Sequence, residues 1–182
     1  NSGSPRYAMR QRLEELQEMA MHDPLTGIAN RRFVEISLTA RLEELKRYGF
    51  IFAIMFADVD KFKRINDTHG HAVGDRILKM ISATIANSLR SFDVIGRWGG
   101  EEFVILLVNI QPETLFSLSD RLRRLVEKSQ LTLDNGEKIS VTVSIGTTIA
   151  RIHETTDSLV ARADKLMYES KRRGRNMVSL EM

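Results

Sequence analysis

The sequence predicts an α+β fold in which helices flank a central, partly antiparallel β-sheet. Helical and strand periodicities alternate along its 182 residues, and 42% of these residues are hydrophobic, which is enough for one sizeable core. A tight β-hairpin is expected in mid-chain, where "FDVIGRW" and "EFVILLV" flank Gly99 and Gly100. Because a hairpin pairs antiparallel strands, the sheet is not purely parallel and doubly wound.

A leader helix is expected at the start of the chain. Four apolar residues recur there at spacings of four, three and four, as in a coiled-coil seam: Met9, Leu13, Leu16 and Ala20. The seam is too short to establish a coiled coil, and the opening letters "NSGSP" resemble an expression scar followed by a cut inside a longer protein. We therefore expect residues 1–22 to be scar plus leader helix and residues 23–182 to form one domain.

The next elements follow from caps and apolar patterns. Asn30 is expected to cap a helix that runs to about Tyr48 and stops at Gly49. "FIFAIMFADVD" is apolar on both faces, which is typical of a central strand covered on both sides. A second helix is predicted over residues 75–90, where one stripe is apolar, and the two hairpin strands come after it.

The last third of the chain alternates in the same way. Its expected elements are a helix from near Pro112 to about Ser129, a turn at 134–136, a strand at "ISVTVSIGTTIA", a helix from Asp157 to Arg173 and a strand at "NMVSL", with an extra short strand around 131–133.

Composition excludes several classes of protein. The longest apolar run, residues 50–57, is far shorter than the roughly 20 residues that span a bilayer. The chain has no cysteine, which rules out disulfides and Cys-based zinc sites and suits a reducing compartment. A net charge of +3 does not favour nucleic acid as a partner. No "GxxxxGK[ST]" is present, so the chain is not a P-loop enzyme.

Carboxylates cluster at the predicted strand ends. Asp58 and Asp60 close the first strand, while Glu101 and Glu102 open the strand after the hairpin. If these strands are neighbours, Asp58 and Glu101 face each other at one rim of the sheet, where they could hold Mg²⁺ for phosphate chemistry. The alternative is that each is a loop acid that ends a strand. That alternative weakens for the set, because acids beside apolar strands carry a desolvation cost that a cation offsets.

"GGEEF" at 99–103 resembles the signature of the GGDEF family, the diguanylate cyclases. Further blocks fall in the order of that family: "DPLTGIANRR" at 23–32, "FADVDKFKRINDTHGHAVGD" at 56–75, "SIGTT" at 144–148 and "ADKLMYESKRRGRN" at 163–176. The resemblance spans about residues 23–180. It implies a nucleotidyl-cyclase-like fold and identifies residues 23–182 as a GGDEF catalytic domain.

The resemblance implies an activity and a metal site. Such proteins condense two GTP molecules into cyclic di-GMP and two pyrophosphates in an antiparallel homodimer. Asp58 and Glu101, with the backbone carbonyl of Val59, would bind Mg²⁺, two ions per site, with Mn²⁺ as a substitute. Gly99 and Gly100 lack Cβ atoms and would let the hairpin tip approach the nucleotide. Glu102 is expected either to orient the attacking hydroxyl or to support the hairpin.

The resemblance also implies that Asn66 and Asp75 bind guanine and that Phe62 belongs to the substrate-binding residues. An amide and a carboxylate can distinguish guanine, which presents two donors on one edge, from adenine. Taken without the surrounding motif, Asn66 reads as a turn residue and Asp75 as a helix N-cap. His69 and His71 lack a third ligand at suitable spacing, so we expect them to be structural.

Phosphates would be held by Lys63, Lys171 and Arg175. Read alone, "KRRGR" at 171–175 is a solvated helix end whose cations complement the helix dipole.

"RSFD" at 90–93 resembles the inhibitory product site of the family, in which Arg90 and Asp93 would bind cyclic di-GMP. As an isolated pattern it is an exposed ion pair at a helix end, worth at most ~1 kcal/mol.

Two other classes stay open. One is a family member that binds GTP or cyclic di-GMP without turnover, and the other is a nucleotidyl transferase that acts on nucleic acid. The cyclase reading implies a cytoplasmic domain under an upstream sensor, and it leaves membrane attachment of the whole protein undecided.

Overall fold

The fold is built on a five-stranded mixed sheet with strand order β2-β3-β1-β6-β7. A computed structural model describes residues 3–182, so the first two residues of the expected scar lie outside it. Only β6 and β7 pair in parallel, and the other neighbours are antiparallel. The predicted α+β fold is therefore confirmed. The strands are β1 Phe52–Val59, β2 Val94–Arg97, β3 Glu102–Val108, β6 Val143–Ile149 and β7 Val178–Glu181.

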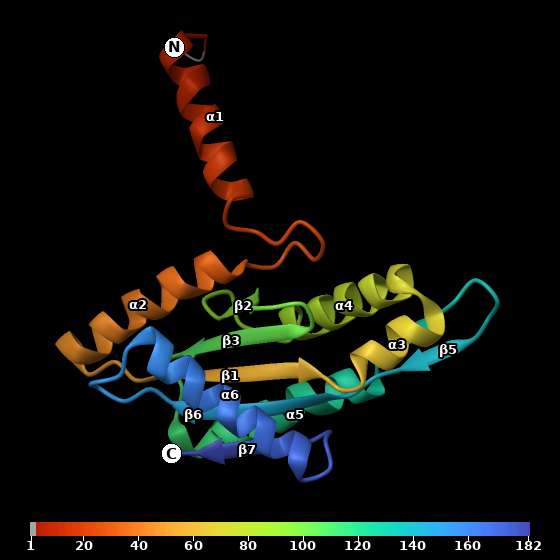
Figure 1. Ribbon diagram of the computed structural model, residues 1–182. Coiled ribbons are helices and arrows are strands. Elements are labelled where there is room, and N and C mark those ends of the chain that lie inside the picture. The colour runs from red at the N-terminus through yellow and green to blue at the C-terminus, as the bar shows by residue number, and fades with distance from the viewer. Residues whose placement is uncertain (1–2) are drawn as a thin grey trace.

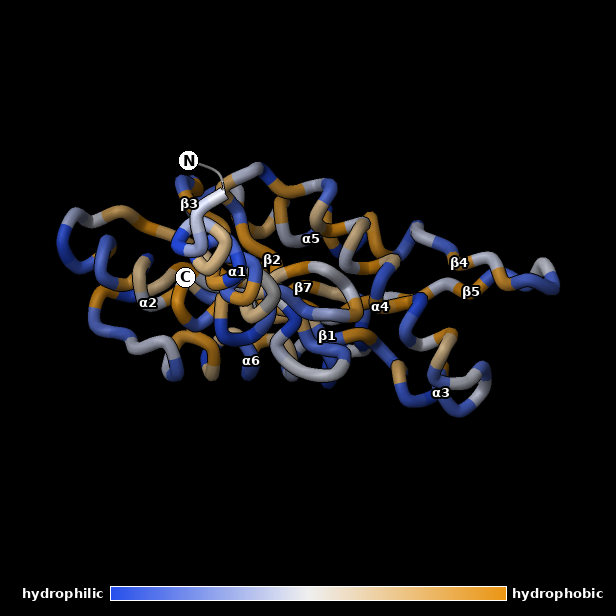
Figure 2. The backbone as a smooth tube through the Cα atoms, turned by 90° about the horizontal axis from the view of Figure 1, so that it is seen from above, coloured by the Kyte–Doolittle hydropathy of each residue, from blue (hydrophilic) through white to orange (hydrophobic). Residues whose placement is uncertain are grey.

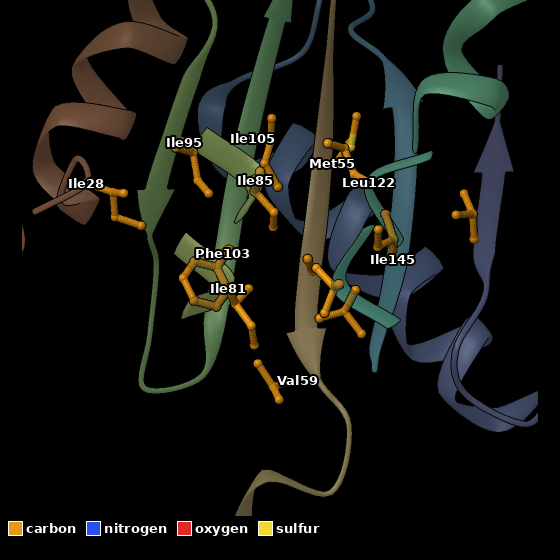
Figure 3. Close-up of a cluster of buried hydrophobic side chains, with 14 of the residues drawn as sticks. Ile28, Met55, Val59, Ile81, Ile85, Ile95, Phe103, Ile105, Leu122 and Ile145 are labelled. Carbon is orange, nitrogen blue, oxygen red and sulfur yellow. The ribbon is translucent and has the colours of Figure 1, made fainter. Parts of the chain in front are cut away.

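Helices cover both faces of the sheet (Figure 1). On one face α2 (Arg31–Tyr48) and α6 (Thr156–Arg172) pack on Ile54 and Phe56 of β1. On the other face α4 (His71–Ala86) and α5 (Leu115–Lys128) pack on the cluster that contains Met55, and Figure 3 shows Met55 beside Leu122, with Ile81 and Ile85 in the same cluster. Alternate residues of β1 thus enter two cores, as the doubly apolar strand predicted.

Helix α6 lies directly on β6 because β6 carries a glycine at the contact. A Cβ atom at Gly146 would overlap the backbone of Ala163 and Met167. The helix starts with a capping box between Thr155 and Ser158. This close packing directs the C-terminal end of α6, which contains Lys171, across the sheet.

The connection after β1 differs from the prediction. Helix α3 (Phe62–His69) was not predicted, and α4 begins at His71 rather than at 75. Gly70, with φ 91° and ψ 162°, separates the two helices and lies at the N-cap position of α4. The turn reading of Asn66 and the N-cap reading of Asp75 are both wrong, because both residues lie inside helices.

The hairpin tip is also wider than predicted. The connection at Gly99 and Gly100 is longer than the tight turn expected there, because it consists of residues 98–101, and neither glycine has positive φ. Instead, the amide of Trp98 donates to the carbonyl of Glu102 at 2.8 Å. Arg90 and Asp93 lie in the loop after α4, not at a helix end as expected.

A small second sheet completes the fold. The short strand predicted around 131–133 is β4 (Gln130–Thr132), which pairs across the predicted turn with β5 (Lys138–Ser140). The single strand predicted at 139–150 is therefore split into β5 and β6. Figures 1 and 2 place α3 and this hairpin at one end of the molecule and α2 at the other.

The leader helix α1 (Pro5–Met19) projects away from the sheet and its covering helices (Figure 1). Its predicted seam residues Met9, Leu13 and Leu16 are exposed, and Ala20 follows the last turn. Within residues 3–182, every helix is too short or too polar to cross a membrane.

Candidate active site

The end of β1 and the hairpin tip lie side by side, as the strand-end acids predicted. Asp58 stands opposite Glu102 in the antiparallel pairing, and the amide of Val59 donates to the carbonyl of Glu101 at 3.2 Å. Burial raises the pKa of Asp58, and the negative charges of Glu101 and Asp60 add to this against the opposing effect of Lys171. This crowding of acids favours a cation between them.

A cationic side chain does occupy that position. The Lys171 ammonium lies 2.7 Å from Asp58 Oδ1 and 3.3 Å from Asp60 Oδ1. Lys171, which was predicted to bind phosphate, therefore contacts Asp58, which was predicted to bind metal. Its ammonium group takes the place of a bound cation. No three His, Cys, Asp or Glu side chains of residues 3–182 form a ready metal cluster. Oxygen donors from Asp58 and Glu101 nevertheless fit Mg²⁺, which usually completes its shell with waters and phosphate oxygens.

Asp60 differs from Asp58 although it is only two residues away. It is 5% exposed, and it accepts hydrogen bonds from Thr142 Oγ1 and Ser144 Oγ, each at 2.7 Å, and from the amide of Asn176 at 3.1 Å. Asp60 was expected only as one of the strand-end acids, and no function of its own was predicted for it. The hydroxyl residues at the start of "TVSIG" were the available signal.

The hairpin tip is held by Arg97. Its Nε and Nη2 donate to the carbonyl of Gly100 at 3.0 and 2.8 Å, while Nη1 lies 3.4 Å from Asp23 Oδ1. Asp23 accepts two hydrogen bonds from Thr26, at 2.9 and 2.7 Å. Burial acts to raise the pKa of Asp23, but the Thr26 hydrogen bonds and the Arg97 charge outweigh it and hold the pKa below its ordinary value. No function was predicted for Arg97 or Asp23.

Glu102 folds over the tip. A Cβ atom at Gly99 would overlap Glu102 Oε1. Burial raises the pKa of Glu102, and the charges of Asp58, Asp164 and Glu101 add to this, whereas Arg31 opposes it. The Arg31 guanidinium lies 4.1 Å from the centre of the Trp98 ring, so a cation also borders this side of the tip.

The structure brings the predicted guanine residues together where α3 packs on α4. A Cβ atom at Gly74 would overlap Asn66 Oδ1 and lie 3.2 Å from Phe62 Cζ, and Asp75 is the next residue. Asn66 Oδ1 is buried without a hydrogen-bond partner among residues 3–182. A buried acceptor of this kind costs free energy until a donor reaches it.

The predicted phosphate residues come from two elements. Lys63 is exposed in the first turn of α3, and Arg175 lies in the turn between α6 and β7. A hollow of about 450 Å³ between these elements is lined in part by Lys61, Arg64 and Arg175. Its cations could hold an anionic ligand.

Arg90 and Asp93 lie away from this rim, where β2 begins and β3 ends. Asp93 has a side chain that is 3% exposed, and it accepts from the amide of Arg90 at 3.1 Å. The Arg90 side chain is 48% exposed, with its Nε 3.5 Å from Asp93 Oδ2. Both residues line a cavity of about 420 Å³. The pair is therefore more buried than a plain surface ion pair.

Comparison with known proteins agrees with this arrangement. A family model described as "Diguanylate cyclase, GGDEF domain" matches residues 20–177. Diguanylate cyclase DosC of Escherichia coli K12 is 38% identical over 171 residues, which cover 92% of this chain and 37% of that protein. The chain thus spans little more than a third of the length of this relative.

Two solved structures are also similar. One is diguanylate cyclase SiaD with its activator SiaC from Pseudomonas aeruginosa, with a TM-score of 0.88, 38% identity, and coverage of 97% of this chain and 67% of that chain. The other is the coiled coil and GGDEF domain of DgcB from Caulobacter crescentus with c-di-GMP, with a TM-score of 0.91, 28% identity, and coverage of 96% and 92%. Because the family model matches most of the sequence and both folds agree, the chain belongs to the GGDEF-domain family of diguanylate cyclases.

Proposed function

We propose that this chain is a diguanylate cyclase that condenses two GTP molecules into cyclic di-GMP and two pyrophosphates. The observation that carries the proposal is the meeting of Asp58 with the hairpin tip, where Lys171 already supplies a cation. Asp58, Glu101 and the carbonyl of Val59 would hold two Mg²⁺ ions, or Mn²⁺ in their place. In this "GGEEF" variant Glu101 replaces the aspartate of the signature. The metal would offset phosphate charge during phosphoryl transfer.

The remaining residues bind and orient the nucleotide. Asn66 and Asp75 accept hydrogen bonds from the guanine edge beside Phe62, and the buried, unpartnered Asn66 Oδ1 supports this assignment. Lys63, Lys171 and Arg175 neutralise the phosphates and the departing pyrophosphate. The 3′-hydroxyl of one GTP then attacks the α-phosphate of the other, so that positioning and charge neutralisation supply most of the catalysis.

Such a reaction needs two nucleotides, which we assign to an antiparallel homodimer with one GTP on each chain. The exposed apolar residues of α1 would form the contact that aligns the two chains. The similar DgcB structure includes a coiled coil. We infer that residues 23–182 act as the cytoplasmic output domain of a longer signalling protein, under an upstream sensor.

The direct test is to incubate the purified chain with Mg²⁺ and GTP and to identify the products by mass spectrometry. Cyclic di-GMP and pyrophosphate are expected, and ATP should give no cyclic dinucleotide. Binding of GTP without any product would instead favour the non-turnover family member.

Product inhibition is proposed at Arg90 and Asp93. DgcB was solved with c-di-GMP, and an arginine fork can pair with guanine or phosphate. Arg90→Ala should keep GTP turnover and relieve inhibition by added cyclic di-GMP, measured as initial rate against product concentration. Superimposed inhibition curves for the two proteins would leave Arg90 only its ion pair with Asp93.

A further inference from the structure

Asp60 is the acid at this rim whose hydrogen-bonding capacity is already filled. Its Oδ1 accepts from Ser144 Oγ at 2.7 Å and from Lys171 Nζ at 3.3 Å. Its Oδ2 accepts from Thr142 Oγ1 at 2.7 Å and from the amide of Asn176 at 3.1 Å. These donors match the four acceptor positions of a carboxylate, which leaves none for a metal ion or a nucleotide.

One of these donors belongs to a strained turn. Gly174, Arg175 and Asn176 follow one another with φ values of 124°, 66° and 47°. Successive positive φ values are unfavourable for residues with a Cβ atom and persist only where surrounding contacts hold them. Asp60 supplies such a contact, and Arg123 adds another by donating to Asn176 Oδ1 at 2.9 Å. Asp60 therefore fixes the turn that presents Arg175.

Another donor is Lys171, which also bridges to Asp58. The Asp58 side chain is 14% exposed and the Asp60 side chain 4%. A cation bound at Asp58 would displace the ammonium from that carboxylate. Asp60 is already saturated and buried, so it would keep Lys171 at the rim, free to face an incoming phosphate.

We propose that Asp60 is a positioning residue that holds Lys171 and Arg175 together for the triphosphate of the nucleotide without touching it. The inference rests on the proposed function, because it assumes that GTP binds at this rim. Its alternative is that Asp60 only stabilises the fold. The two differ in what they predict for ligands with one phosphate and with three.

The test is the Asp60→Asn variant. Asparagine keeps the shape, but it removes the charge that holds Lys171 and turns one acceptor into a donor. Binding is measured by calorimetry with Mg²⁺ and a GTP analogue that carries a methylene bridge between the α- and β-phosphates, which turnover cannot cleave. The Kd of this analogue should rise roughly 10- to 100-fold. The Kd of GMP should change by less than about threefold, because most of the phosphate contacts are missing.

Two comparisons sharpen this test. Asp67→Asn removes an exposed carboxylate from α3, with the same change of charge, and should bind both ligands as the unaltered chain does. Lys171→Met should weaken binding of the analogue as well. In a chain that already carries Lys171→Met, Asp60→Asn should raise the Kd of the analogue by a smaller factor than it does alone, because the two residues act on the same phosphates.

Thr142→Val covers the case in which Asp60→Asn does not fold. It removes one donor and leaves the carboxylate, so a smaller loss, again confined to the triphosphate, is expected. Equal losses for GMP and the analogue, or a lower melting temperature with unchanged affinities, would overturn the inference and leave Asp60 a fold-stabilising residue. If the unaltered chain failed to bind the analogue at all, the proposed function would fall and this inference with it.

Discussion

The two walls of the candidate site are held in different ways. One wall, called the buried wall below, consists of Lys171 and the turn at 174–176 and is centred on the buried Asp60 carboxylate, whose four acceptor positions are all filled. The opposite wall is the hairpin tip at 98–101, where Gly100 is exposed and its carbonyl is held by the Arg97 side chain. A buried network in which every polar group is hydrogen-bonded is rigid and costly to disturb. A surface loop whose side-chain contacts come from one residue can shift more easily.

This difference separates two tasks. The buried wall suits phosphate binding, which gains from fixed cations. The tip suits the alignment of reacting groups, and Arg97 links it to Asp23 in the segment that follows α1.

The largest effect should come from the two predicted metal ligands, Asp58 at the end of β1 and Glu101 in the hairpin tip. Asp58→Ala and Glu101→Ala should each lower turnover by about 1,000-fold or more, because an uncompensated triphosphate loses several kcal/mol of transition-state stabilisation. Initial rates of pyrophosphate release measure this, with circular dichroism to verify folding and Asp67→Asn as the charge-matched control. Rates like those of the unaltered chain in both variants would contradict the metal assignment.

Arg97→Ala should break the tip and spare the buried wall. Losing two hydrogen bonds to the Gly100 carbonyl and the contact with Asp23 should lower kcat roughly 10- to 100-fold, since misplaced reacting groups slow the chemical step. The Kd of the uncleavable GTP analogue should change by less than about threefold, the reverse of the pattern expected for Asp60→Asn. Arg124→Ala, an exposed arginine on α5, is the matched control. A loss of affinity at unchanged kcat would show that the two walls do not divide the work.

The two glycines of the tip offer a finer comparison. A Cβ atom at Gly99 would overlap Glu102 Oε1, whereas one at Gly100 would meet no described atom within 4 Å. Gly99→Ala should reorient Glu102 at a stability cost below about 1 kcal/mol, because the end of a flexible side chain can move. Gly100→Ala should leave stability unchanged. It should slow turnover only because its added methyl group would meet the bound nucleotide. Melting temperatures and rates for both variants measure these effects, and unchanged rates in Gly100→Ala would mean that the nucleotide does not approach the tip closely.

How much of each wall could be predicted from the sequence depends on whether its contacts join residues that are near or far apart along the chain. The β1 and β3 strands were predictable because acids lie at one end of each apolar run, and the antiparallel pairing of β1 with β3 confirms that Asp58 and the tip meet. Helix α3 was missed because Gly70 divides one polar segment into two helices, which hid the positions of Asn66 and Asp75. The four donors to Asp60 lie 82 to 116 residues away along the chain, and Asp23 lies 74 residues from Arg97, so no local pattern indicates these contacts.

The smallest expected effect concerns the link between the tip and the leader segment. The pKa of Asp23 in the folded chain lies below its ordinary value of 3.8, so the charged form stabilises the fold. This contribution is fully present above pH 3.8 and is lost as the pH falls through the lower folded pKa, because the unfolded chain binds the proton first as the pH falls.

Asp23→Asn should therefore unfold about 1 kcal/mol more easily than the unaltered chain at neutral pH, and this gap should close in acid below pH 3.8. Urea unfolding of both proteins across that range measures the gap, with Asp67→Asn as the control that shows no such closure. A gap that stays constant into acid would mean that the Asp23 carboxylate does not stabilise the segment through its charge, and that Arg97 holds the Gly100 carbonyl without help from that charge.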